Sequence, residues 1–116
     1  MVQDFRELRI WQNGMQIVKQ SYLLTKQFPK EEIFGLVSQV RRAAVSIPSN
    51  VAEGFARNHD NEYRQFLYIA LGSCAELETH FEITKQLNYC KNDELAEVQN
   101  LIKLEIKMIL RMIKSL

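Results

Sequence analysis

Apolar residues recur along the chain at alternating steps of three and four positions, which is the period of an α-helix with one buried face. Three segments carry this pattern at Leu8, Trp11, Met15, Val18 and Tyr22; at Leu36, Val40, Ala44, Ile47 and Val51; and at Tyr63, Leu67, Ala70, Cys74, Leu77 and Phe81. A fourth carries it at Leu95, Val98, Ile102, Ile109, Ile113 and Leu116. No comparable stretch alternates with period two, so the pattern predicts four helices and no sheet.

The stretches between these segments hold residues that end or begin helices. Pro29 follows the first segment, residues 58–61 (Asn-His-Asp-Asn) supply N-cap types before the third, and residues 92–94 (Asn-Asp-Glu) repeat the pattern before the fourth. Connections this short force neighbouring helices to run antiparallel. We therefore predict an all-α, up-down-up-down antiparallel four-helix bundle that forms one domain over residues 1–116.

Pro48 is the irregular position of the second segment. Inside a helix, a proline removes the hydrogen bond to the carbonyl of Ala44 and clashes with that turn, at a cost of roughly 3 kcal/mol if unrelieved. The helix either kinks at Pro48 or breaks there, with Asn50 capping a new helix and Glu53 three residues on. Because the apolar spacing continues through the proline without a change of phase, we expect the kink.

The last segment is too apolar for the surface of a monomer, since ten of the sixteen residues from Leu101 to Leu116 are aliphatic or methionine. Beside the stripe that faces the core runs a second apolar stripe, formed by Leu101, Leu104, Met108 and Met112. A helix with two apolar stripes needs two partners. We therefore predict a homo-oligomer whose interface includes these four residues.

Composition narrows the class of protein. A hydrophobic fraction of 47% suffices for one core, and the net charge of +1 gives no global attraction to nucleic acid, so such binding would need local patches or assembly. With no secretory leader and no apolar run of about 20 residues, we expect a cytoplasmic protein without a membrane partner. Cys74 and Cys90, read as lying on one helix about 24 Å apart, are beyond disulfide reach, which fits a reducing compartment.

The residues that could carry catalysis are sparse. The chain has no glycine-rich phosphate loop, no nucleophile elbow and no metalloprotease motif. Glu76 and His80 lie one helical turn apart, but a di-iron bundle needs two Glu-x-x-His motifs, and the chain has none. We predict that the protein is no enzyme and carries no metal or cofactor, and we interpret Ser73 and Cys74 as close helix packing beside Gly72.

The second segment carries a polar stripe of seven residues. Its members recur mainly at steps of three and four and are Arg42, Ser46, Asn50, Glu53 and Arg57, with Gln39 and Ser49 beside them. Such groups can satisfy carbonyls freed by Pro48 or bond an adjacent helix or subunit. We favour this structural interpretation over the alternative, direct ligand binding.

Basic residues form a ridge on the last segment, at Lys103, Lys107, Arg111 and Lys114. One interpretation is a solvated face with cations near a helix C-terminus, and taken alone it is the favoured one. The alternative is a nucleic-acid contact surface, with Arg41 as a further contact, that an oligomer would repeat around its axis.

Three stretches of the chain together resemble a known family. They are Leu8-x-x-Trp11, the string RRAAVSIPSNVAEG at residues 41–54, and FLYIALGS at residues 66–73 followed by ELE at 76–78. They resemble the bacterial four-helix bundle proteins named after the open reading frame in intervening sequences of 23S ribosomal RNA genes. That resemblance implies a ring of subunits, a homopentamer in known members, and no known catalysis. The related accessory variability determinant of diversity-generating retroelements binds nucleic acid and a reverse transcriptase.

The leading functional hypothesis is a non-enzymatic, homo-oligomeric binding module for structured RNA or a nucleoprotein partner. The second is a protein-only scaffold that binds neither RNA nor DNA. A metal carrier or enzyme ranks last. Binding that falls steeply with salt would favour the first hypothesis, and a partner that survives nuclease treatment would favour the second.

Overall fold

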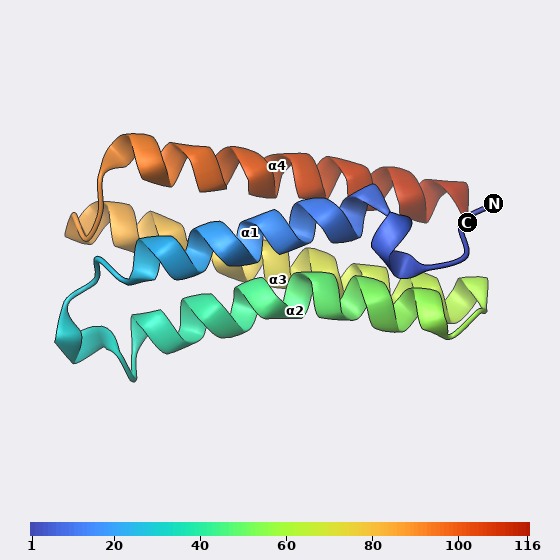
Figure 1. Cartoon of the computed structure of the whole chain (residues 1–116), viewed down its shortest axis with the longest axis horizontal. Coiled ribbons are helices and arrows are strands. Elements are labelled where there is room, and N and C mark those ends of the chain that lie inside the picture. The colour runs from blue at the N-terminus through green and yellow to red at the C-terminus, as the bar shows by residue number, and fades with distance from the viewer.

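The computed structural model describes residues 1–116 and contains four α-helices, two short 3-10 helices and no strand. The elements are, in order, η1 (Phe5–Glu7), α1 (Arg9–Thr25), η2 (Lys30–Glu32), α2 (Leu36–Ala56), α3 (Asp60–Leu87) and α4 (Asn92–Ser115). The predictions of an all-α fold and of four helices are therefore confirmed. Figure 1 shows the four helices side by side along the long axis of a molecule that measures 44 × 25 × 19 Å.

Each long helix packs against two others, because α1 contacts α2 and α4, and α3 contacts the same two. In Figure 1 the chain runs along each helix in the direction opposite to that of the helix before it. The α1–α2 connection therefore lies at one end of the molecule, and both chain termini lie at the other end. None of the helices combines the length and the apolar character that crossing a membrane requires.

The core is one cluster of 22 buried apolar residues contributed mainly by the four long helices. All the apolar positions predicted for α2 and α3 are buried, and in α4 the first four are buried while Ile113 and Leu116 are half-buried. Burial of this apolar area, at about 25 cal/mol per Å², supplies the main driving force for the bundle.

The predicted stripe of α1 is correct only in part: Leu8 is buried, and Trp11 and Val18 are half-buried and pack against the core. Met15 and Tyr22 are exposed, whereas the buried residues of α1 are Ile10, Gly14, Ile17, Ser21, Leu24 and Thr25. The physical reason is close helix packing: a methyl group on Gly14 would lie only 3.3 Å from Cβ of Pro48 on α2. Small side chains face the core where α1 and α2 approach, and larger apolar ones line the surface beside them.

The predicted caps also differ from the structure. The N-cap residues of α3 and α4 are His59 and Lys91, and neither side chain caps its helix. Asn58 instead adopts the left-handed region, with φ of 60°, in the α2–α3 turn. Asn88 does the same after α3, so Cys90 lies beyond that helix rather than on it, and both cysteines are unpaired.

Pro48 lies inside a continuous α2, so the alternative of a break capped by Asn50 is wrong. The kink at this proline stays a prediction. Gly54, near the end of α2, is a point of close approach to α3, because a methyl group there would lie 2.7 Å from Cβ of Phe66. Gly72 was expected to mark close packing, but it is exposed with open space around it.

Candidate functional site

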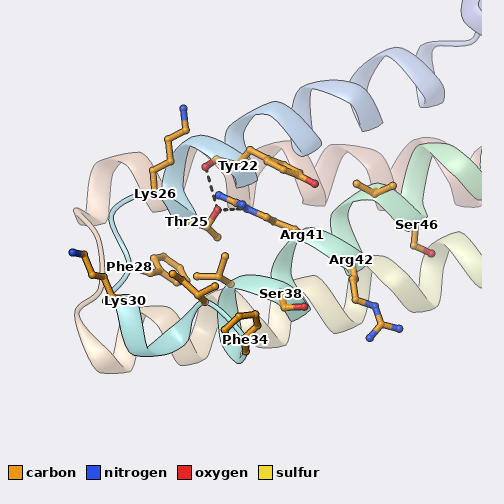
Figure 2. A pocket seen from close by; sticks show the side chains of 13 residues that line it. Tyr22, Thr25, Lys26, Phe28, Lys30, Phe34, Ser38, Arg41, Arg42 and Ser46 are labelled. Atoms are coloured by element: carbon orange, nitrogen blue, oxygen red, sulfur yellow. Dashed lines mark hydrogen bonds between the residues drawn. The ribbon is translucent and has the colours of Figure 1, made fainter.

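A hollow of about 930 Å³ lies between the last turn of α1 and the first half of α2, at the end of the molecule opposite the termini. We call it the α1–α2 groove, and Figure 2 shows the thirteen side chains that line it. Its size is in the range of sites that hold a small molecule or part of a larger one. Four of its lining residues are cationic and none is acidic; the four are Lys26, Lys30, Arg41 and Arg42.

The connection between α1 and α2 forms one wall of this groove, and hydrogen bonds of Glu32 hold it in place. Oε1 of Glu32 accepts a hydrogen bond of 3.1 Å from the backbone N–H of Leu36, and its Oε2 accepts one of 2.8 Å from the hydroxyl of Tyr89. These donors, the backbone one first, lower the pKa of Glu32, so the carboxylate stays charged. The ring of Phe28 packs 5.4 Å from that of Tyr89, which further ties the wall to the α3–α4 connection.

Arg41 is the most closely held cation of the groove. Its Nε donates to Oγ1 of Thr25 at 2.9 Å, and its Cζ lies 4.5 Å from the centroid of the Tyr22 ring. In Figure 2 the guanidinium group folds back over Thr25 and Tyr22, while the ammonium groups of Lys26 and Lys30 extend outward. The Nη atoms of Arg41 make no hydrogen bond within the chain, so they keep their donors for a ligand.

The positive charge of the groove is not neutralised by the chain itself. The salt bridges of the structure engage Arg6, Arg57 and His80, and none engages a cation of the groove. A smaller hollow of about 500 Å³ adjoins the groove, and Glu76 lines it together with Arg42 and Phe34. No salt bridge joins Glu76 to Arg42, so the guanidinium group of Arg42 is left without an ionic partner.

Two of the aromatic side chains that line the α1–α2 groove are exposed to solvent. Phe34 is 97% exposed and Tyr22 is 39% exposed, although both are large apolar groups that burial would stabilise. Exposed aromatic faces between unpaired cations are typical of surfaces that bind nucleic-acid strands, because every base has a face that can stack.

The predicted polar stripe of α2 divides into parts with different surroundings. Nδ2 of Asn50 donates to Oγ of Ser46 at 2.9 Å, and Oγ of Ser46 lies 2.8 Å from Oγ of Ser73 on α3. The hydroxyl of Ser73 donates to the carbonyl of Ile69, so its single hydrogen is used and Ser46 is the donor between the two serines. The side chain of Asn50 also donates to the carbonyl of Ser46, and not to that of Ala44, which Pro48 frees.

The other members of the stripe lie apart from this network. Nη2 of Arg57 bonds Oε2 of Glu53 at 3.2 Å, and its Nη1 lies 3.6 Å from Oε1 of Glu62 at the start of α3. Arg42 belongs to the α1–α2 groove, and Gln39 and Ser49 are exposed. The stripe is thus a helix–helix network in its middle, an ion-pair cluster at one end and part of the groove at the other.

The predicted basic ridge of α4 is exposed along its whole length, at Lys103, Lys107, Arg111 and Lys114. None of the four cations makes a salt bridge. Lys103 borders a hollow between α3 and α4 that Glu78 and Glu82 also line, so the field there is mixed in sign. Arg41, predicted as a further contact, lies on the α1–α2 groove rather than beside this ridge.

Only part of the predicted interface stripe of α4 is exposed and available for contact with another subunit. Leu101, Met108 and Met112 are half-buried and pack against the chain's own core. Leu104 is 43% exposed, and Leu110, which lies about 120° away from it around the helix axis, is 48% exposed. The surface that α4 offers to another molecule is therefore narrower than the sequence pattern indicates.

Sequence reasoning missed Glu105, a fully buried carboxyl group on α4. Nδ2 of Asn13 donates to its Oε1 at 3.0 Å and also to the carbonyl of Leu101 at 3.0 Å. Burial raises the pKa of Glu105 to about 8, and the hydrogen bond from Asn13 opposes this shift. Burial first, and then Glu105, raises the pKa of the Cys74 thiol to about 12. A signal was present, because Glu105 fills the gap between Ile102 and Ile109 in the apolar stripe.

No group of three or more histidine, cysteine or acidic side chains lies close enough together to hold a metal ion. The Glu76 and His80 pair has its closest atoms, Oε2 and Nε2, 4.0 Å apart. The absence of an enzyme activity and of a cofactor stays a prediction.

Comparison with known proteins gives two findings. The family model described as 23S rRNA-intervening sequence protein matches residues 6–111. A crystal structure of a protein of unknown function from the S23 ribosomal protein family, from Bacteroides thetaiotaomicron, superposes with a TM-score of 0.81. It shares 18% identity over 90% of this chain and 98% of that chain, a likeness that supports the fold alone. No curated protein matches the sequence.

Proposed function

Because the chain belongs to the family of 23S rRNA-intervening sequence proteins, we propose that it is a non-enzymatic, homo-oligomeric module that binds structured RNA. In this proposal the subunit is an up-down-up-down bundle, copies of it form a ring, and the α1–α2 groove is the main contact surface. The single observation that carries the proposal is the groove itself, with four unpaired cations, no acidic lining residue and exposed aromatic rings.

Charge supports the groove over the ridge of α4. Phosphate groups bind where several cations face one surface without carboxylates to compete for them. The groove meets this condition, whereas Lys103 shares its hollow with two glutamates. The ridge then acts as a secondary surface that adds to the positive field.

Assembly into an oligomer would allow a chain whose net charge is only +1 to bind RNA. One groove with four cations makes few phosphate contacts, but several grooves on one assembly bind a folded RNA at several points. The second contact of a multivalent complex is intramolecular, so the overall affinity rises without any new kind of contact.

Two triple variants with the same change of charge test the proposal. One is Lys26→Glu, Lys30→Glu and Arg42→Glu in the groove, and the other is Lys103→Glu, Lys107→Glu and Arg111→Glu on the ridge. We expect affinity for a structured RNA, measured by fluorescence anisotropy at several salt concentrations, to fall steeply with salt for the parent. The groove variant should lose binding, and the ridge variant should lose much less of it.

Circular dichroism of both variants checks that the bundle stays folded. Equal affinities for the parent and the groove variant would refute the groove as the contact surface. A parent protein that binds no RNA at low salt would refute the function.

A protein-only scaffold is the second candidate. It is favoured by the large apolar side chains that stand exposed on α3 and α4, at Tyr68, Ile69, Ile83, Leu87, Leu104 and Leu110. This candidate expects a protein partner that co-purifies from native cells after nuclease treatment and no binding to RNA or DNA at physiological salt.

A further inference from the structure

We propose that the α1–α2 groove binds an unpaired nucleotide of an RNA strand, whose base stacks on Phe34 while its flanking phosphates contact Arg41, Arg42 and Lys30. This inference rests on the proposed RNA binding. It specifies which part of an RNA the groove recognises, namely a base that is not paired within a helix.

The exposure of Phe34 is the first step of the argument. Its side chain is 97% exposed, the highest value of any phenylalanine, tyrosine or tryptophan in the chain, and it stands on a wall that Glu32 and Tyr89 fix by hydrogen bonds. The wall of the groove is therefore fixed by contacts within the chain, and it presents the ring of Phe34 to solvent, where a base can cover it. Gly35 next to it leaves room for this arrangement, because a methyl group there would lie 2.8 Å from Oε1 of Glu32.

Charge complementarity identifies the occupant. Phe34 lines both the groove and the adjoining hollow, and Arg42 lines both with it, so a ring and a guanidinium group border the same space. Arg41 is held by Thr25 and by the Tyr22 ring with its Nη donors unused, and these two donors suit the oxygens of a phosphate. An apolar peptide would leave these cations without partners, whereas a nucleotide satisfies both the ring and the charges.

The shape of the site selects against a duplex. Bases inside a helix stack on one another and offer only their edges, so a ring such as Phe34 can stack on a base that has left the helix or ends it, but not on one in its interior. A volume of about 930 Å³ is sufficient for a base, its sugar and an adjoining phosphate.

The test compares variants at one salt concentration with a labelled 12-nucleotide oligoadenylate and a 12-base-pair RNA duplex as probes. We expect the parent to bind the single strand at least tenfold more tightly than the duplex. Phe34→Ala should weaken single-strand binding by about 5- to 150-fold with an unchanged salt dependence, because stacking and not charge is lost. Phe34→Trp should retain binding.

Tyr68→Ala is the matched control, since Tyr68 on α3 is also an exposed aromatic residue, 55% exposed, but does not line the groove. It should bind as the parent does. A second readout uses Phe34→Trp with Trp11→Phe, which leaves one tryptophan, at the site, because Trp11 is the only one in the chain. Its fluorescence should be quenched when the oligoadenylate binds.

Three outcomes would overturn the inference: equal affinities for Phe34→Ala and the parent, equal affinities of the parent for strand and duplex, or a Phe34→Ala variant whose oligomer dissociates in sedimentation. The third outcome would assign Phe34 to a contact between copies of the chain. The proposed function falls separately, if the parent binds neither probe.

Discussion

Glu105 places an ionisable group where the rest of the bundle is apolar. Its side chain has no exposed surface, and Oε2 has no hydrogen-bond partner, because the one contact from Asn13 goes to Oε1. Gly14 makes the space for this carboxyl group, since a methyl group there would lie 3.4 Å from Oε2. A charged carboxylate at this position is unfavourable because burial removes its hydration.

Stability should therefore fall with rising pH in a way that depends on Glu105. The pKa of this group rises from 4.5 to about 8 on folding, so the folded state binds more protons than the unfolded state between these values. Its contribution is fully present below about pH 4.5 and is lost as the pH rises through about 8, with a slope of up to roughly 1.4 kcal/mol per pH unit. Glu105→Gln, which stays neutral, should lack this slope.

Urea unfolding at pH 5 and pH 8, at one protein concentration, measures the effect as a difference between the parent and the variant. Other titrating groups are common to both proteins and cancel in this difference. Parallel pH profiles would show that Glu105 titrates at the same pH in the folded and unfolded states, contrary to the prediction.

At the scale of the helix, sequence predicts some elements fully and others only in outline. The seam of α3 is correct at every position because this helix packs against both α2 and α4. The stripe of α1 is wrong at Met15 and Tyr22. Close approach near Gly14 and Pro48 favours small groups at the interface, and no pattern of hydrophobicity along α1 alone reports the distance to α2. The groove escaped prediction for a similar reason, since two of its cations come from α2 and the other two, Lys26 and Lys30, come from the connection that precedes it.

The α2–α3 contact at Gly54 yields a stability prediction at this scale. Gly54→Ala would place Cβ 2.7 Å from Cβ of Phe66 and 3.3 Å from the carbonyl oxygen of Tyr63, so the two helices must separate. We expect a loss of about 1–3 kcal/mol in the free energy of unfolding, as for other overpacked positions.

Gly72→Ala is the matched control, because Gly72 also lies inside a helix but nothing is within 4 Å of the added group. This variant should gain roughly 0.5–1 kcal/mol, since alanine loses less backbone entropy in a helix. Thermal or urea unfolding of the two variants reports both values. A loss at Gly72 equal to that at Gly54 would refute the packing explanation.

At the scale of the whole molecule, the predicted homo-oligomer depends on apolar surface that the single chain leaves uncovered. Leu104 is the exposed member of the predicted interface stripe. Leu104→Glu should shift the protein toward the monomer in sedimentation velocity at micromolar concentration, because a charge buried in an interface without a partner is strongly unfavourable.

Leu23→Glu is the control for this substitution, since Leu23 is 46% exposed, against 43% for Leu104, but lies on α1 outside the stripe. It should leave the sedimentation coefficient unchanged. A parent that sediments as a clean monomer would contradict the predicted assembly, and a variant that assembles as the parent does would exclude Leu104 from its interface.

Both termini lie at the end of the bundle opposite the α1–α2 groove (Figure 1). An affinity peptide or biotin attached ahead of Met1, which is fully exposed, would tether the protein to a sensor surface with the groove directed toward the solution. The other terminus is a poorer attachment point, because Nη2 of Arg64 donates to the carbonyl of Leu116 at 3.0 Å. Immobilisation through the first residue thus suits surface-based binding measurements.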